Sequence, residues 1–441
     1  MPKLDSGQAL YAEAKKYIPG GTQLLSKRPE MFLPEQWPSY YQSANGIKVV
    51  DLDGREYLDF SHMGVGTCPL GYSDEDVNRA VAGAVSRGSM CTLNCPEEVE
   101  LARELCRIHP WADKVRFART GGESMTIAVR IARAATRRSH IILCGYHGWH
   151  DWYLSANLQG DVLGGSDLLL PGLDPGGVPN ELKGTVSTFQ YNDIESVRSL
   201  IKKHPTAAIV CETQRGQKPD PSFFPELKKL AEDNGALLIL DEITSGFRLN
   251  VGGLHLQMGI EPHIAVLGKA MGNGYAIGAV IGTAEAMEIA QDSFISSTYW
   301  TERIGPTAAL ATLEKLDRTD ACKKMTAAGL RVQSIWAEQG HKVGLDIHAG
   351  PEAMPPLSHL SWHYENARAV QTLWCQMMLE QGFLDNCGFY ATAAHTDEMI
   401  DRYEEAVKKV FPQMASAIES GTVESSLRGP VGHSGFRRLT S

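Results

Sequence analysis

The stretch ALLILDEITSGFRLNVGGLHLQMGIEPHIAVLGKAMGNGYAIGAVIG, which spans residues 236–282, decides the fold of this 441-residue chain. It contains three short apolar runs, at Ala236–Leu240, Ala265–Leu267 and Ala279–Gly282. Short runs that are apolar throughout are typical of strands covered on both faces. We therefore expect these runs to be strands of a mostly parallel sheet.

The same pattern continues on the N-terminal side of this stretch. Apolar runs at Val115–Ala118, Ile141–Cys144 and Ala207–Cys211 alternate with amphipathic helical stretches such as Glu123–Arg137 and Pro225–Asn234. Alternation of this kind predicts an α/β fold with helices on both faces of the sheet.

The pattern changes on both sides of this region. Residues 46–60, GIKVVDLDGREYLDF, predict a hairpin that turns at Asp53-Gly54. Beyond about residue 318, long helical stretches predominate. We expect residues 67–318 to form the large domain, and the segments 1–66 and 319–441 to form a smaller α+β domain from both termini.

Composition excludes several classes of function. The formal net charge of −10 gives no bulk attraction to nucleic acid or to an anionic membrane, so neither is expected as a partner. No run of 18 apolar residues and no signal peptide occurs, so we expect a cytoplasmic protein. The nine cysteines are scattered without a CxxC pair, which favours reduced thiols and no metal site.

Polar residues follow several of the apolar runs, at the points where strands should end. Ligands of an open parallel sheet bind at the carboxyl ends of its strands, so these residues are candidates for a site. They are Gly121, Gly122, Tyr146, His147, Glu212, Asp241 and Lys269.

Most of these residues have a structural explanation beside the functional one. Gly121 and Gly122 can serve a tight turn, or can hold a phosphate at a helix N-terminus. Asp241 can cap a helix, or can meet a cation, because a buried carboxylate is costly without a partner. Lys269 can reach solvent, or can stay in an apolar pocket as an amine nucleophile of lowered pKa.

Taken together, the candidates are the parts that pyridoxal-5′-phosphate (PLP) requires. They supply a phosphate cradle, a ring-stacking aromatic, an aspartate for the pyridine nitrogen and a lysine for a Schiff base. The joint pattern therefore favours a PLP site over separate structural explanations.

The sequence resembles the class III, fold type I, PLP-dependent aminotransferases, and within them the glutamate-1-semialdehyde 2,1-aminomutase-like branch. The resemblance covers roughly residues 10–415. Its most specific segments are RTGGESMTIAVRIARAATRR, GYHGWHDWY, LLILDEITSGFRL, VLGKAMGNGYAIGAVIG and ATAAHTDEMID.

The resemblance implies a role for each matching residue. Lys269 would carry PLP, Asp241 would pair with the pyridinium nitrogen, and Ile243 would pack on a ring face. Tyr146 would stack on the ring, and Glu212 would lie near the phenolic oxygen.

The resemblance also implies a phosphate site shared between subunits. Gly121 and Gly122 would bind the phosphate of their own subunit, whereas Thr298, in SSTYW, would reach the phosphate of the partner's cofactor. Such an arrangement requires a homodimer. Where the family often has Ser-Gly-Thr, this chain has Thr120-Gly121-Gly122, so one hydroxyl is lost and the backbone must compensate.

Other departures concern the substrate. Bulky residues at 299–303 replace a stretch that contains glycine and asparagine in the family. Many class III transaminases carry an arginine that clamps the α-carboxylate, and the corresponding segment here, FLDNCGFYATAAHTDEMID, offers none. Lys27 or Arg28 could supply that cation instead, and the residues alone do not choose between them. His147 and Trp300 complete the expected substrate-binding set.

The expected activity is a PLP-dependent aminotransferase that moves an amino group onto a ketone or aldehyde acceptor. It would act through a Lys269 Schiff base and a pyridoxamine intermediate, with a sugar or another secondary metabolite as one candidate acceptor. The alternatives are intramolecular amino transfer of the aminomutase type, an epimerase or decarboxylase on the same fold, and a cofactor-binding protein without turnover.

Overall fold

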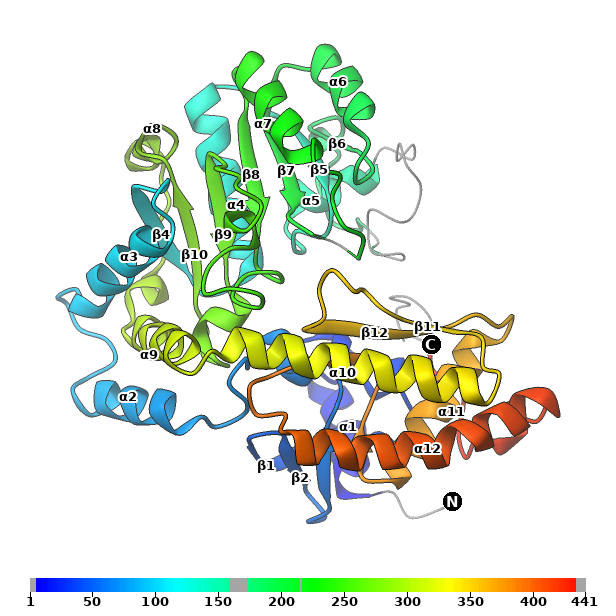
Figure 1. Cartoon of the computed structure of the whole chain (residues 1–441). Coiled ribbons are helices and arrows are strands. Elements are labelled where there is room, and N and C mark those ends of the chain that lie inside the picture. The colour runs from blue at the N-terminus through cyan, green and yellow to red at the C-terminus, as the bar shows by residue number, and fades with distance from the viewer. Residues whose placement is uncertain (1–4, 159–172, 174, 215, 434–441) are drawn as a thin grey trace. The chain divides into compact units, whose positions relative to one another are not determined.

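The computed structural model describes residues 5–158, 173, 175–214 and 216–433 (Figure 1). The chain divides into two compact units. The large unit is Glu75–Thr319, and the small unit combines Met1–Asp74 with Asp320–Ser441. The domain boundaries expected at 66/67 and 318/319 stay a prediction.

A seven-stranded sheet forms the centre of the large unit. Only β10 runs antiparallel to its neighbours, so the predicted mostly parallel sheet is confirmed. All six apolar runs lie in or overlap these strands, whereas β6 is short and partly polar and was not predicted. In spatial order the strands are β4 (Lys114–Ala118), β10 (Gly278–Gly282), β9 (Ile264–Leu267), β8 (Leu237–Asp241), β7 (Thr206–Glu212), β5 (His140–Cys144) and β6 (Val186–Thr188).

Helices cover both faces of this sheet, as predicted. Successive residues of a strand point to opposite faces, and β5 shows the result. Ile141 and Leu143 join the core that includes α4, whereas Ile142 and Cys144 join the core that includes α6 and α7. The α-helices of the large unit are α2 (Glu75–Ser86), α3 (Pro96–Ile108), α4 (Gly121–Thr136), α5 (Asp151–Leu154), α6 (Ile194–Lys203), α7 (Phe223–Asp233), α8 (Ala284–Met287) and α9 (Ile304–Arg318).

The small unit has two sheets and four helices in its described residues. The predicted hairpin is confirmed, because β2 pairs antiparallel with β3. The helices are α1 (Ser6–Tyr17), α10 (Ala321–Lys342), α11 (Ala367–Glu380) and α12 (Asp397–Glu419). The strands are β1 (Tyr41–Asn45), β2 (Lys48–Asp51), β3 (Glu56–Asp59) and β13 (Phe383–Leu384) in one sheet, and β11 (Ile347–Gly350), β12 (Leu357–Trp362) and β14 (Gly388–Tyr390) in the other.

Segments from both ends of the chain build this unit together. The short strand β13 pairs parallel with β3, so that Phe383 lies opposite Leu58. Phe60, which follows β3, stacks on Tyr403 of α12 with ring centroids 4.3 Å apart. The smaller α+β unit from both termini is therefore confirmed.

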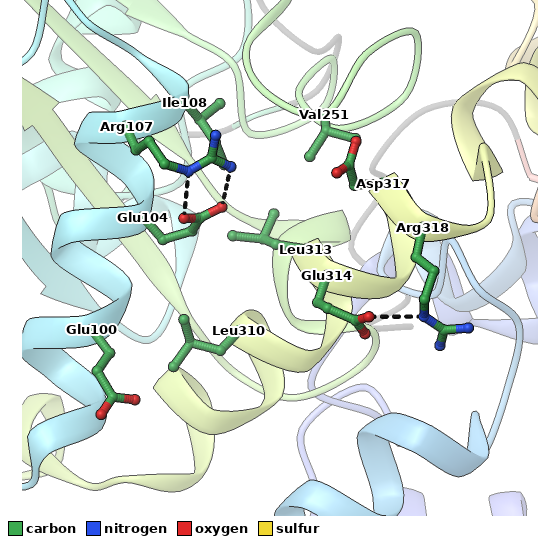
Figure 2. A pocket seen from close by; sticks show the side chains of 10 residues that line it. All are labelled: Glu100, Glu104, Arg107, Ile108, Val251, Leu310, Leu313, Glu314, Asp317 and Arg318. Carbon is green, nitrogen blue, oxygen red and sulfur yellow. Dashed lines mark hydrogen bonds and ion pairs between the residues drawn. The ribbon is translucent and has the colours of Figure 1, made fainter.

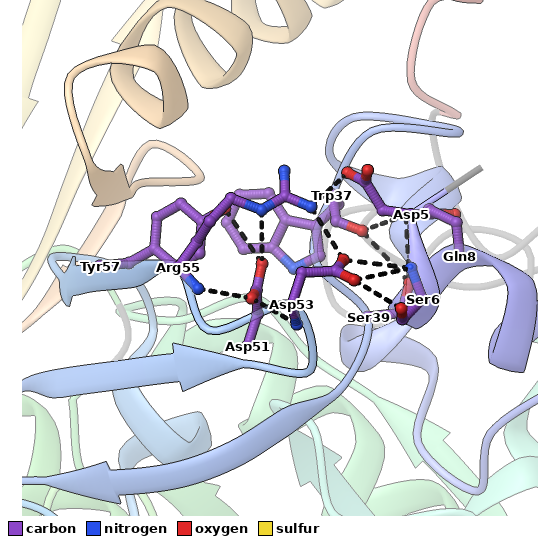
Figure 3. A network of polar contacts seen from close by, with 9 residues as sticks. All are labelled: Asp5, Ser6, Gln8, Trp37, Ser39, Asp51, Asp53, Arg55 and Tyr57. Carbon is purple, nitrogen blue, oxygen red and sulfur yellow. Dashed lines mark hydrogen bonds and ion pairs between the residues drawn. The ribbon is translucent and has the colours of Figure 1, made fainter. Parts of the chain in front are cut away.

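A polar network fixes the start of α1 to the β2–β3 hairpin (Figure 3). The Arg55 guanidinium lies 2.7 Å from an Asp5 oxygen and 2.9 Å from an Asp53 oxygen. The backbone N–H of Ser6 donates to Asp53 at 3.1 Å. The hairpin turn thereby supplies acceptors for the first turn of the helix.

Two further observations concern the whole chain. No helix in the described ranges is long and apolar enough to cross a membrane. All nine cysteines are free thiols.

Candidate active site

The carboxyl ends of the central strands gather most of the predicted cofactor residues. Asp241 ends β8 and lies opposite Glu212, which ends β7. Lys269 follows β9, and Tyr146 follows β5. The parallel strands therefore bring residues that are far apart in the sequence to one edge of the sheet.

Lys269 opens a short 3-10 helix, η7 (Lys269–Gly272), with a left-handed φ of 42° that residues with side chains rarely adopt. Its Nζ donates to Thr244 Oγ1 at 3.0 Å. Burial lowers the pKa of Lys269, and the nearby Arg248 charge lowers it further, although Glu212 and Asp241 oppose this. These surroundings favour the neutral amine, which is the nucleophilic form.

Asp241 is 4% exposed and has a partner for each oxygen. One oxygen accepts from the backbone N–H of Ile243 at 3.0 Å, and the other lies 2.8 Å from His147 Nδ1. The carboxylate is therefore fixed in orientation at the end of β8.

His147 contacts Asp241 inside the large unit, and its predicted role in substrate binding stays a prediction. Its side chain is only 1% exposed, and its Nε2 lies 3.1 Å from the Cys144 carbonyl oxygen. Both ring nitrogens thus face acceptors, and each contact needs a proton. The side chain is engaged with the protein on both sides.

Glu212 shapes the loop that presents Tyr146. Its Oε2 accepts from the Tyr146 backbone N–H at 3.0 Å. A β-carbon on Gly145 would lie 2.6 Å from the same oxygen, and Gly145 has a φ of +117° that favours glycine. The Tyr146 side chain remains 40% exposed and meets Tyr153 edge-on. Its ring is therefore open to a ligand on the other side.

The N-terminus of α4 carries Gly121 and Gly122. Thr120 caps the helix and shares a capping box with Glu123, whose carboxylate accepts from the Thr120 N–H at 2.9 Å. Within the described residues, the N–H groups of Gly121 and Gly122 have no protein acceptor. A β-carbon at position 121 would lie 3.0 Å from Ile243 Cδ1, so Ile243 borders this helix end.

Two neighbours of Lys269 were not predicted as site residues. Thr244 holds its amine, as described above, and Arg248 is buried at 1% exposure with its Nε donating to the Thr244 carbonyl at 3.0 Å. Arg248 lies within the quoted LLILDEITSGFRL motif. The position of Thr244 and Arg248 within that motif was the only sign in the sequence that they belong near the site.

The remaining predicted residues are not brought to this sheet edge by any described contact. Thr298 is exposed at the start of a 3-10 helix, η9 (Thr298–Thr301). Trp300 is half-buried against the core of the large unit, and its buried Nε1 has no partner among the described residues. Lys27 and Arg28 belong to the small unit, where Lys27 is exposed and Arg28 packs over Gly20.

A cavity of about 670 Å³ in the large unit lies elsewhere, between α3 and α9 (Figure 2). Its floor includes Leu310 and Leu313, and its polar rim is occupied by internal ion pairs such as Glu104–Arg107 at 2.6 Å. None of the predicted site residues lines it.

Comparison with known proteins identifies relatives of this chain. The family model described as Aminotransferase class-III matches residues 34–343. The chain is 29% identical to a 3-aminobutyryl-CoA aminotransferase of Cloacimonas acidaminovorans, over 93% of this chain and 98% of the relative. It is 31% identical to a 2'-deamino-2'-hydroxyneamine transaminase of Streptomyces kanamyceticus, over 84% and 91% of the two chains. It is 32% identical to a glutamate-1-semialdehyde 2,1-aminomutase of Methanosarcina acetivorans, over 91% and 97%.

The fold has solved counterparts. The PLP internal aldimine form of the FumI protein of Sphingopyxis sp. MTA144 superposes with a TM-score of 0.84 at 23% identity, covering 94% of this chain and 97% of that one. The architecture of the sheet and of the unit built from both termini is therefore one that holds PLP in a solved protein.

Proposed function

This chain belongs to the class-III aminotransferase family, and on that premise we propose that it moves an amino group between two separate small molecules. It is a PLP-dependent enzyme, and its acceptor is a ketone or an aldehyde. The observation that carries the proposal is the gathering of Lys269, Asp241 and the α4 N-terminus in one unit.

The residues of this edge fit PLP chemically. The open N–H groups of Gly121 and Gly122 suit its phosphate. The Asp241 carboxylate suits its ring nitrogen, and the Lys269 amine suits its aldehyde carbon. Ile243 and Tyr146 would then flank the ring.

Glu212 and Thr298 complete the proposed cofactor site. The Glu212 carboxylate would lie on the side of the phenolic oxygen, because it ends the strand beside Asp241. Thr298 would bind the phosphate of the partner's cofactor.

Bound PLP supplies an electron sink for the carbon that carries the amino group. The chain's own residues supply the charge near the ring nitrogen and transfer the proton. Asp241, held by His147, keeps negative charge where the ring nitrogen binds. The Lys269 amine would take a proton from the carbon that carries the amino group in the donor and, in the second half-reaction, give one to the former carbonyl carbon of the acceptor, and Thr244 Oγ1 positions that amine.

Intramolecular amino transfer of the aminomutase type is the second candidate. It is favoured by the 32% identity to an aminomutase, and the same residues of the large unit would serve it. The choice depends on the substrate-binding residues, for which we propose Trp300 together with Lys27 or Arg28. Lys27 or Arg28 would bind a substrate carboxylate, because the segment FLDNCGFYATAAHTDEMID supplies no arginine for it.

A half-reaction experiment separates the two candidates. The PLP-loaded enzyme is mixed with single amino donors, without acceptor, and the released keto acid is measured beside the cofactor absorbance. A transaminase releases keto acid in proportion to enzyme and leaves the cofactor in its amine form. Isomerisation of glutamate-1-semialdehyde without release of any keto acid would contradict our proposal.

We also propose that the enzyme is a cytoplasmic homodimer with shared active sites. Large apolar side chains around Thr298 support the dimer, since Phe294 is 88% exposed and Tyr299 is 71% exposed. Apolar exposure of this kind favours an interface. The free thiols support a reducing compartment.

A further inference from the structure

His150 fills the space beside Gly122. A β-carbon at position 122 would lie 3.0 Å from His150 Cδ2 and 3.1 Å from His150 Nε2. The chain reaches this position through Gly148, whose φ of +106° lets the backbone pass over the start of α4. The imidazole therefore stands where a longer side chain at position 122 would stand.

A contact between Thr126 and the Nδ1 edge of this imidazole fixes the orientation of the ring. The Thr126 hydroxyl donates its single proton to the Gly122 carbonyl at 2.9 Å and accepts from Trp152 Nε1 at 3.1 Å. It also lies 2.8 Å from His150 Nδ1. Because the hydroxyl has no second proton to give, His150 Nδ1 must be the donor. Nε2 then forms the opposite edge, and it has no partner in the part of the chain that the structure describes.

The charged side chains described at the α4 N-terminus already have partners. The Glu123 carboxylate is held by the N–H groups of Arg119 and Thr120, at 3.1 and 2.9 Å. The Arg119 guanidinium is already paired with Glu302 at 3.1 Å. Burial lowers the pKa of His150, and the charges of Glu123 and Asp151 offset this only in part. A phosphate dianion at Nε2 would act in the opposite direction, because its charge favours the protonated ring, in which Nε2 as well as Nδ1 can donate.

We infer that His150 is a phosphate ligand of the cofactor in this chain, its Nε2 taking the place of the hydroxyl that a threonine at position 122 would offer. The inference deepens the proposed function and rests on it. It changes the expectation that the backbone alone compensates for the missing hydroxyl.

Binding measurements on the apoprotein test this inference without any turnover. Dissociation constants are measured for PLP and for pyridoxal, which lacks the phosphate. His150→Ala should weaken PLP binding by about tenfold or more, as expected for a hydrogen bond to a charged group, and should leave pyridoxal binding unchanged. His150→Gln should retain part of the affinity, because its amide can donate near the Nε2 position. His341→Ala, at an exposed position in α10, is the matched control and should bind both ligands normally.

A second pair of variants tests whether the His150 imidazole occupies the space of a side chain at position 122. Gly122→Thr should weaken PLP binding by collision with the imidazole. Gly122→Thr combined with His150→Ala should recover affinity, because the threonine hydroxyl then has room. Equal PLP affinity of His150→Ala and the unaltered protein would overturn the inference and leave the proposed function intact. Failure of the unaltered protein to bind either ligand would instead overturn the proposed function.

Discussion

At the scale of single residues, the sequence gives no indication of the contact between His147 and Asp241. The two residues are 94 positions apart, and His147 follows Tyr146, whose ring faces the open side. From the sequence, we expected the side chains of Tyr146 and His147 both to face the bound ligands. A strand end lets neighbours point in opposite directions, and only the fold shows that the histidine turns inward to the carboxylate.

Replacement of His147 tests its positioning role. His147→Leu should lower kcat by tenfold to about a hundredfold, because Asp241 loses the partner that fixes its carboxylate. His147→Asn can still donate to Asp241 and should recover much of that loss. The two variants should also differ in the pH dependence of the cofactor absorbance. Equal kcat and equal spectra for both variants and the unaltered enzyme would leave the histidine a packing residue.

Lys27 and Arg28 carry the proposed carboxylate recognition. Alanine substitution of the correct residue should raise KM for an acidic substrate several-fold and leave the cofactor spectrum unchanged, since only substrate binding is affected. Lys16→Ala, an exposed lysine on α1, is the control. Unchanged KM for both variants with every acidic substrate tried would refute carboxylate binding by this segment.

At the scale of elements, apolar runs were sufficient to place six of the seven strands of the large sheet. Runs such as Ala207–Cys211 are buried on both faces, so their composition reports their environment directly. The strand β6 was missed because Val186–Thr188 is only three residues long and two of the three are polar. The local sequence around Thr244 likewise contains nothing to show that its hydroxyl meets Lys269, because β9 brings the lysine there.

The segment that carries Thr298 is anchored at its C-terminal end by charged side chains. Glu302 pairs with Arg119 at 3.1 Å and also accepts from the N–H groups of Ile304 and Gly305 at the start of α9. Because both side chains of the pair are largely buried, Glu302→Gln should lower the free energy of unfolding by about 1–3 kcal/mol.

Chemical denaturation measures this loss, with Glu288→Gln as the control. Glu288 pairs with Lys114 at the surface and should contribute at most about 1 kcal/mol. Equal effects of the two substitutions would show that the Arg119 pair does not anchor the segment.

At the scale of the whole molecule, the proposal of shared active sites predicts complementation between variants. Lys269→Ala and Thr298→Ala should each lose most activity as separate proteins. If Thr298 serves the partner's site, a mixed dimer contains one site with an intact Lys269 and an intact Thr298. Activity should therefore return when the two variants are unfolded and refolded together.

The control for this experiment is each variant refolded alone, which should stay inactive. Sedimentation of the mixture should show a dimer. Absence of any recovered activity in a mixture that does form dimers would place Thr298 in the site of its own subunit, or in none.

The account as a whole depends on Lys269 as the residue that carries the cofactor, and one measurement tests this most directly. The protein is loaded with PLP, reduced with borohydride to make the link permanent, digested and mapped by mass spectrometry. We predict one modified peptide, containing Lys269, and no modification in Lys269→Ala. A reduced link to another lysine in the unaltered protein, or the persistence of a link in Lys269→Ala, would contradict the account.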